Sequence, residues 1–144
     1  DVRSKVTVNQ WLMWQMGGLG PMSGQRGHFH VYAPERIPYA MDRYDRETTR
    51  LHGVLDKRLA DNAFVAGDAY SIADMACYPW IDAYAGLPPD FGAFPNMKRW
   101  YDSIAARPAT ARAYAWKEKV NPDAGKPMTD EERRHLFGQG AQQK

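Results

Sequence analysis

The chain has 144 residues, with 19 Lys and Arg against 17 Asp and Glu, a formal net charge of +2. This length suits one domain with a full hydrophobic core, and so small a charge surplus gives no reason to expect a nucleic-acid or anionic membrane partner. The one cysteine, Cys77, excludes an internal disulfide and any Cys-x-x-Cys motif and is compatible with a reducing cytosol. With no apolar run long enough to span a bilayer, we expect a cytoplasmic protein without a membrane partner.

The first predicted helix runs from about Arg3 to Met16, because Val6 and a cluster of Trp, Leu and Met side chains give it an aromatic-rich face. It is expected to stop at Gly17-Gly18. The segment from Gly17 to Pro34 contains five glycines and has neither helical nor strand periodicity. This composition predicts a long loop, of the kind that is often functional.

A second helix is predicted from about Pro34 to Ala60. Its apolar side recurs at spacings of three and four: Ile37, Met41, Tyr44, Thr48, Leu51, Leu55 and Leu59. The opposite side is charged and holds two pairs four residues apart, Asp42 with Arg46 and Arg43 with Glu47. Such exposed pairs contribute only about 0.3–0.5 kcal/mol each.

The sequence around Ser71 predicts the start of a third helix. Ser71 has the properties of an N-cap, and Asp74, three residues later, completes a capping box by reaching back to the Ser71 N–H. The helix that follows, to Ile81, is apolar on every side, which predicts a central, buried helix.

Two more helices are predicted, one after Pro95 and a shorter one ending near Trp116, and no β pattern is present. The sequence therefore predicts an all-α bundle of about five main helices. Residues 121–144 are polar and rich in Gly, Pro and Gln, so we expect a mobile tail, in which Thr129 and Glu132 are able to cap one short helix.

The residues alone identify no catalytic group. His28 and His30 lack a Cys or carboxylate at zinc spacing, so we interpret them as loop-surface histidines and expect no metal. Cys77 lies in the most apolar segment, where a thiol behaves as a small hydrophobe. From the residue pattern alone, we interpret Arg43 as a solvated surface arginine and Trp14 as a core aromatic.

The string from Phe64 to Asp74, FVAGDAYSIAD, resembles the capping-box helix in the C-terminal domain of cytosolic glutathione transferases. The segments QWLMWQMGGLGP (10–21) and IPYAMDRY (37–44), with the turn at 107–110, look like one branch of that family. That branch is the nu-class, disulfide-bond oxidoreductase type of bacterial glutathione S-transferase. The resemblance covers about Lys5 to Val120.

The resemblance implies a two-domain enzyme, of which this chain holds the all-α C-terminal domain at residues 1–120. The N-terminal thioredoxin-like domain, which binds glutathione and activates its thiol, is absent from this chain, so we expect the chain alone to be inactive. Members are homodimers that use glutathione to reduce disulfides by thiol exchange, without a protein cysteine. The expected partners are therefore glutathione and a small electrophile or disulfide.

The family places a glutathione-contacting arginine at the position of Arg43, where a guanidinium can bind a glutathione carboxylate through two parallel hydrogen bonds. Four other residues are expected to line the wall that faces the second glutathione or an electrophile: Trp14, Met22, Phe29 and Tyr32. The sequence departs from the family pattern after Gln25, where Arg26-Gly27-His28 replaces a polar residue followed by two histidines.

Another class of protein shares this fold, namely transferase-like C-terminal domains that act as non-catalytic interaction scaffolds on translation proteins. A scaffold needs only the buried capping-box helix and the core. Because this chain also has the glycine-rich segment and Arg43, we favour the enzyme domain. A ligand-sequestering bundle without turnover is a third hypothesis, and it predicts binding of aromatic compounds with no dependence on thiols.

Overall fold

A computed structural model describes residues 1–82, 86–121 and 128–138. Within these ranges the regular elements are helices, apart from one isolated β-bridge between Phe64 and Gly67. The all-α prediction is therefore confirmed. No helix in the described ranges is both long enough and apolar enough to cross a bilayer.

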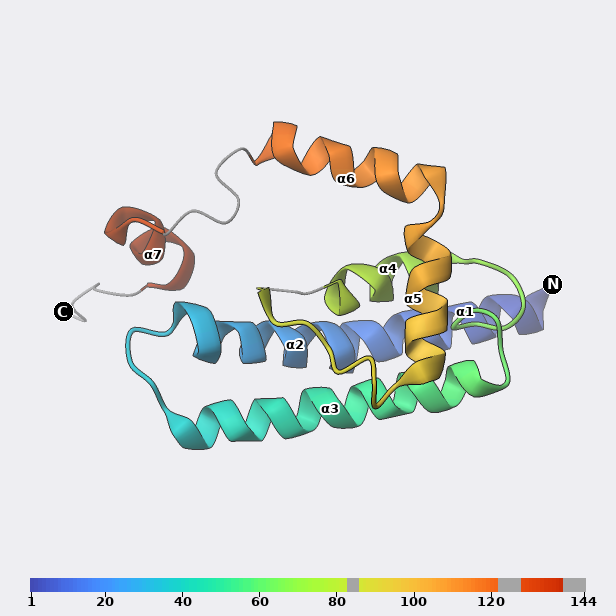
Figure 1. The fold of residues 1–144 in the computed structure, drawn as a ribbon, viewed down its shortest axis with the longest axis horizontal. Helices are drawn as coiled ribbons and strands as arrows, with labels where there is room; N and C mark the ends of the chain where they lie inside the picture. The colour runs from blue at the N-terminus through green and yellow to red at the C-terminus, as the bar shows by residue number, and fades with distance from the viewer. Residues whose placement is uncertain (83–85, 122–127, 139–144) are drawn as a thin grey trace. The chain divides into compact units, whose positions relative to one another are not determined.

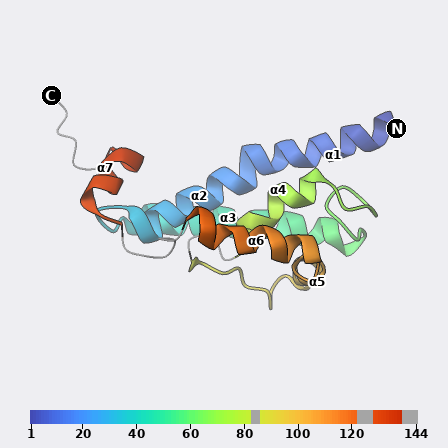
Figure 2. The same ribbon diagram turned by 90° about the horizontal axis from the view of Figure 1, so that it is seen from above.

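The chain begins with four helical elements that follow one another without a break (Figures 1 and 2). They are α1 (Val2–Trp14), the π-helix η1 (Gln15–Leu19), α2 (Gly20–Gly27) and the π-helix η2 (His28–Tyr32). The residues at the three junctions, Gln15, Gly20 and His28, all have right-handed helical backbone angles. The prediction of a long loop from Gly17 to Pro34 was therefore wrong.

Two glycines of this helical segment have a packing role. A Cβ added to Gly20 would lie 3.1 Å from the Trp80 ring, and one added to Gly18 would lie 3.3 Å from Leu51. Both glycines thus allow another helix to come close, a packing role that compensates for their low helix propensity. Single-sequence periodicity counts glycine as a breaker and does not register this role.

Helix α3 (Pro38–Ala60) runs antiparallel to the first helical run and packs along it (Figure 1). It begins four residues later than predicted, because Ala33, which precedes Pro34, is extended and the helix starts with Pro38 at its first turn. Its predicted core side is confirmed at four positions and also includes His52. The buried residues are Thr48, Leu51, His52, Leu55 and Leu59.

Helix α4 (Ile72–Ile81) is buried on one side only. Its inward side consists of Ala73, Asp74, Cys77, Tyr78 and Ile81. On the outward side Ile72 and Met75 are each 52% exposed. The prediction that an all-apolar helix is buried all round is thus wrong within this chain, because the bundle supplies neighbours for one side of α4.

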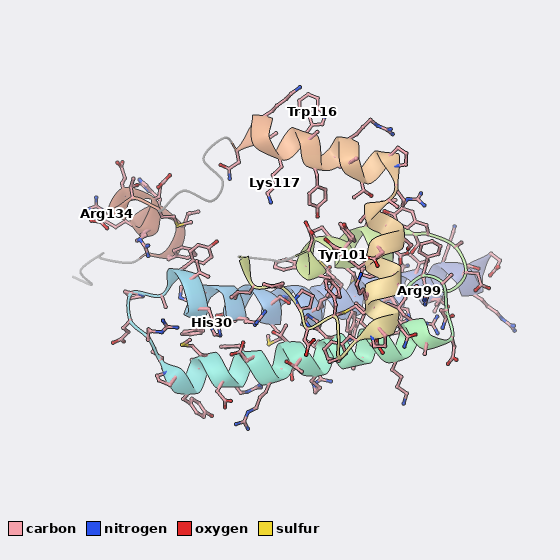
Figure 3. The ribbon with its side chains drawn as sticks, viewed as in Figure 1. His30, Arg99, Tyr101, Trp116, Lys117 and Arg134 are labelled. Carbon is pink, nitrogen blue, oxygen red and sulfur yellow. The ribbon has the colours of Figure 1, made fainter. Side chains whose placement is uncertain are left out.

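Helix α5 (Pro95–Ala105) is joined to α3 by polar contacts at both of its sides. The Asp56 carboxylate of α3 accepts hydrogen bonds from the Met97 N–H (2.9 Å) and from the Asn96 amide (3.1 Å), so it caps the start of α5. Arg99 of α5 donates to the Leu59 and Asn62 carbonyl oxygens at the end of α3 (Figure 3).

The chain divides into two compact units, residues 1–106 and 107–144. The second unit contains α6 (Pro108–Val120) and α7 (Asp130–Phe137). Thr129 and Glu132 form the predicted capping box of α7. The division falls before the boundary at residue 120 that the sequence predicts, and much of the predicted tail, 122–127 and 139–144, lies outside the described residues.

Candidate functional site

The capping box at the start of α4 is present as predicted and is tied into the core. The Asp74 carboxylate, 0% exposed, accepts from the Ser71 N–H at 2.9 Å through one oxygen. Through the other oxygen it accepts from the Val65 N–H and from the Trp100 indole N–H of α5, both at 2.8 Å. The Ser71 hydroxyl in turn accepts from the Ala73 N–H at 3.3 Å. These contacts form a structural centre, which we call the capping-box network.

Cys77, one turn further along α4, is fully buried. Burial, together with the nearby Asp74 charge, raises the pKa of its thiol to about 12. The thiol therefore stays protonated at neutral pH, as expected for a side chain that acts as a small hydrophobe. Tyr101 of α5 is likewise held in its neutral form, because its hydroxyl donates to the Asp82 carboxylate at 2.6 Å and this raises its pKa (Figure 3).

A charged cluster, which the sequence did not predict, joins the first helical run to α3. Asp45 of α3 accepts from the Arg26 Nε at 2.8 Å and lies 3.0 Å from the His30 Nε2 (Figure 3). Arg26 also donates to the Leu87 carbonyl at 3.2 Å. His30 is therefore a partly buried contact on η2, and its interpretation as a loop-surface histidine was wrong. The signal was the four-residue spacing of Arg26 and His30, which has meaning only if this segment is helical.

Arg43 lies exposed near the start of α3. Among the described residues no hydrogen bond or ion pair engages its guanidinium, and its charge contributes through space to lowering the pKa of Glu47, after the hydrogen bond from Arg50. Glu47 pairs with Arg50 at 2.7 Å, and the predicted Asp42–Arg46 pair forms at 2.9 Å. Arg43 is thus a cation that the described chain leaves available for an anionic group.

Three of the four predicted wall residues lie on the first helical run after its midpoint, and the fourth lies before it. Phe29 stacks on Tyr44, the residue after Arg43, with ring centroids 5.4 Å apart. Tyr32 is half-buried at the end of η2, and Met22 is half-buried on α2. Trp14 instead contacts Trp11, at a centroid distance of 5.2 Å. Since Phe29 follows Trp14 by fifteen residues of continuous helix, the two lie roughly 22 Å apart along the axis.

The described residues contain no group of three or more His, Cys, Asp or Glu side chains placed to hold a metal ion. Chemically, the start of α3 carries Arg43, exposed and with no ion pair among the described residues, and the next residue, Tyr44, stacks on Phe29. This combination suits a small ligand with both a carboxylate and an apolar part.

The helical order of unit 1 and its buried capping box define the class of the domain, an all-α bundle. Residues 29–108 match the family described as "Glutathione S-transferase, C-terminal domain". The chain therefore belongs to the glutathione S-transferase C-terminal domain family.

The curated relatives include two disulfide-bond oxidoreductases of Escherichia coli. YfcG is 48% identical over 113 residues, which cover 78% of this chain and 53% of the relative. YghU is 40% identical over 121 residues, which cover 78% of this chain and 41% of the relative. The chain thus spans about half the length of the curated relatives that it matches.

Solved structures give the same assignment. A glutathione transferase from Burkholderia graminis, with two glutathione molecules bound per subunit, aligns at a TM-score of 0.72 and 38% identity, covering 89% of this chain and 53% of that one. The URE2P6 glutathione transferase from Phanerochaete chrysosporium, in complex with oxidized glutathione, aligns at a TM-score of 0.74 and 34% identity, covering 81% and 55%.

Proposed function

We propose that this chain is the helical half of a glutathione-dependent disulfide-bond oxidoreductase, in which Arg43 binds a carboxylate of glutathione. The observation that carries the proposal is the position of Arg43, exposed at the start of α3 and engaged by no ion pair among the described residues. The names of the relatives and the glutathione in the aligned structures support the same reaction class.

The chemistry of glutathione suits this position. Glutathione carries two carboxylates, and an arginine held on a helix can bind one of them in a planar, two-bonded geometry. The stacked Phe29 and Tyr44 rings provide an apolar surface that joins η2 to the start of α3. Phe29, Tyr32 and Met22 therefore stay proposed wall residues for a second glutathione or an electrophile, whereas the distance of Trp14 does not support a place for it in the same pocket.

The proposal is tested in the full protein with Arg43→Ala. We expect the Kd for glutathione, measured by titration calorimetry, to rise about 10- to 100-fold, the range for loss of a charge-assisted hydrogen bond. Arg46→Ala is the matched control, because Arg46 lies on the same helix but pairs with Asp42. Equal Kd values for wild type and Arg43→Ala would contradict the assignment of Arg43.

The proposal assigns thiol activation to a thioredoxin-like domain that is not in this chain, and it includes a cytoplasmic homodimer. We therefore expect that the isolated 144-residue chain does not catalyse glutathione-dependent reduction of a disulfide at a measurable rate. Ordinary turnover by the isolated chain would contradict the assignment of thiol activation to the other domain.

Sedimentation of the full protein at two concentrations tests whether it is a dimer.

A non-catalytic interaction module is the alternative, and exposed apolar residues of α1 and η1 favour it. Val6, Met13 and Met16 are each about 60% exposed in this chain. Such residues are suited to contact with another protein surface. The two functions differ in glutathione binding, because a scaffold has no need for it. Absence of glutathione binding by the full wild-type protein would favour the scaffold.

A further inference from the structure

Three polar side chains are buried between α2 and α3 without a hydrogen-bond partner among the described residues. They are Ser23 Oγ, Thr48 Oγ1 and His52 Nε2. The residues are only 4%, 3% and 5% exposed. Buried polar groups in native proteins almost always have a partner, from the protein or from a bound molecule, so a set of three requires an explanation.

The three side chains line one small cavity, which we call the polar chamber. Its other lining residues are Arg26, Trp80, Leu87 and Pro89. The chamber has a volume of about 10 Å³. This is about the space that the centre of one water molecule needs, and a buried water is held by two to four polar partners. The polar chamber therefore fits one oxygen atom with the three groups around it.

A larger pocket adjoins the polar chamber and shares four lining residues with it, Arg26, Thr48, His52 and Pro89. This outer chamber has a volume of about 260 Å³ and is completed mainly by Thr49, Pro88, Asp90 and Phe94. Phe94 meets the His52 ring edge to face, with centroids 5.8 Å apart. The outer chamber thus offers an apolar, partly aromatic wall next to a polar end. Arg43 and the Phe29–Tyr44 stack are not among the lining residues.

The charge state of the chamber selects a neutral ligand. Burial and the nearby Arg26 charge lower the pKa of His52 to about 4, so the imidazole is neutral at pH 7. The Arg26 charge is compensated by Asp45 at 2.8 Å. A neutral imidazole nitrogen and two hydroxyls are best matched by an oxygen that both donates and accepts, which is the property of an O–H group.

We propose that the polar chamber is a binding site for one uncharged hydroxyl, from water or from a small aromatic alcohol whose ring occupies the outer chamber. Ser23, Thr48 and His52 hold the oxygen, and Phe94 faces the ring. The two sources share one hydrogen-bonding chemistry and differ in whether the outer chamber is filled.

Phenol tests whether the bound hydroxyl comes from an aromatic alcohol, and toluene, which has a similar ring but no hydroxyl, is the comparison ligand. In the full protein we expect the His52 ring signals to shift on titration with phenol, followed by NMR, and toluene to bind at least ten times more weakly. Thr48→Val should weaken phenol binding about tenfold, whereas Thr48→Ser, which keeps the hydroxyl, should restore it. Thr49→Val is the matched control, because Thr49 lines only the outer chamber.

A crystal structure without phenol tests the water source. An oxygen peak within about 2.7–3.2 Å of all three side-chain atoms, lost in Thr48→Val and kept in Thr49→Val, supports the proposal even if phenol does not bind. Toluene binding as tight as phenol, or a phenol titration unaffected by Thr48→Val, would overturn the aromatic source. A chamber closed by direct bonds among Ser23, Thr48 and His52 would overturn the site itself.

Discussion

Asp74 and His52 are both buried polar side chains of unit 1, but the chain completes the bonding of only one of them. The Asp74 carboxylate accepts from Ser71, Val65 and Trp100, at distances between 2.8 and 2.9 Å. His52 Nε2 and its neighbours Ser23 and Thr48 have no such partners among the described residues. The comparison suggests that polar groups satisfied within the chain hold the fold together, whereas groups that lack partners mark a place where another molecule completes the bonding.

Asp74→Ala should have the largest effect on stability. It leaves the Val65 N–H and the Trp100 indole N–H buried without acceptors, so we expect the free energy of unfolding to fall by about 3–5 kcal/mol. Urea unfolding followed by tryptophan fluorescence measures this change. The control is Asp102→Ala on α5, an exposed aspartate paired with Lys98 at 2.6 Å, which should change stability by about 0.5 kcal/mol or less. Similar losses in both variants would mean that the capping-box network is not a stabilising centre.

The pH dependence of stability should report on His52. Its pKa is lowered from 6.5 to about 4 in the folded chain, so the unfolded state binds more protons between these two values. Stability therefore rises with pH across this window, and acidification from pH 6.5 to 4 should remove about 3 kcal/mol.

His52→Gln removes the titrating group and should flatten the curve of unfolding free energy against pH in this window. His135→Gln is the control, because His135 is exposed on α7. The groups near His52 that also carry charge are Arg26, Asp45 and Asp90. A slope between pH 4 and 6.5 that persists in His52→Gln would show that His52 is not the group responsible for the pH dependence.

Gly20→Ala tests whether the glycine at this position is needed for close packing of the segment from 17 to 32 against Trp80 of α4. The new Cβ would lie 2.5 Å from the Gln15 amide nitrogen and 3.1 Å from the Trp80 ring, so we expect a loss of about 1–2 kcal/mol in unfolding free energy. Gly17→Ala is the matched variant, because a Cβ there meets nothing within 4 Å. It should stabilise the helix by up to about 1 kcal/mol. Effects of the same sign in both variants would contradict the packing role of Gly20.

The two capping boxes give the smallest and most direct comparison. Ser71→Ala should destabilise unit 1 by about 0.5–2 kcal/mol, measured by urea unfolding. Thr129→Ala removes the equivalent hydroxyl from the exposed capping box of α7 and should leave that transition unchanged. Its effect should appear only as faster amide exchange within α7. A shift of the main unfolding transition by Thr129→Ala would show that the two units unfold together.

Much of the helical pattern was predicted because it depends on residues close together in the chain. The core side of α3 follows from the spacing of Thr48, Leu51, Leu55 and Leu59, and the start of α4 follows from Ser71 and Asp74. These signals rest on helix periodicity and on capping bonds that span three residues. The family resemblance likewise rests on contiguous strings, so sequence comparison was able to confirm it.

The tertiary structure decided the features that depend on residues far apart in the chain. It packed the glycine-rich helical segment against its neighbours, with Leu51 next to Gly18 and Trp80 next to Gly20. It placed Arg26 and His30 on Asp45, brought Trp100 to Asp74, and gathered Ser23, Thr48 and His52 around one cavity. No local pattern encodes such contacts, since each depends on how two helices approach each other. The sequence alone determined where most helices form and which face of α3 is buried, and the packing of those helices decided which polar groups meet.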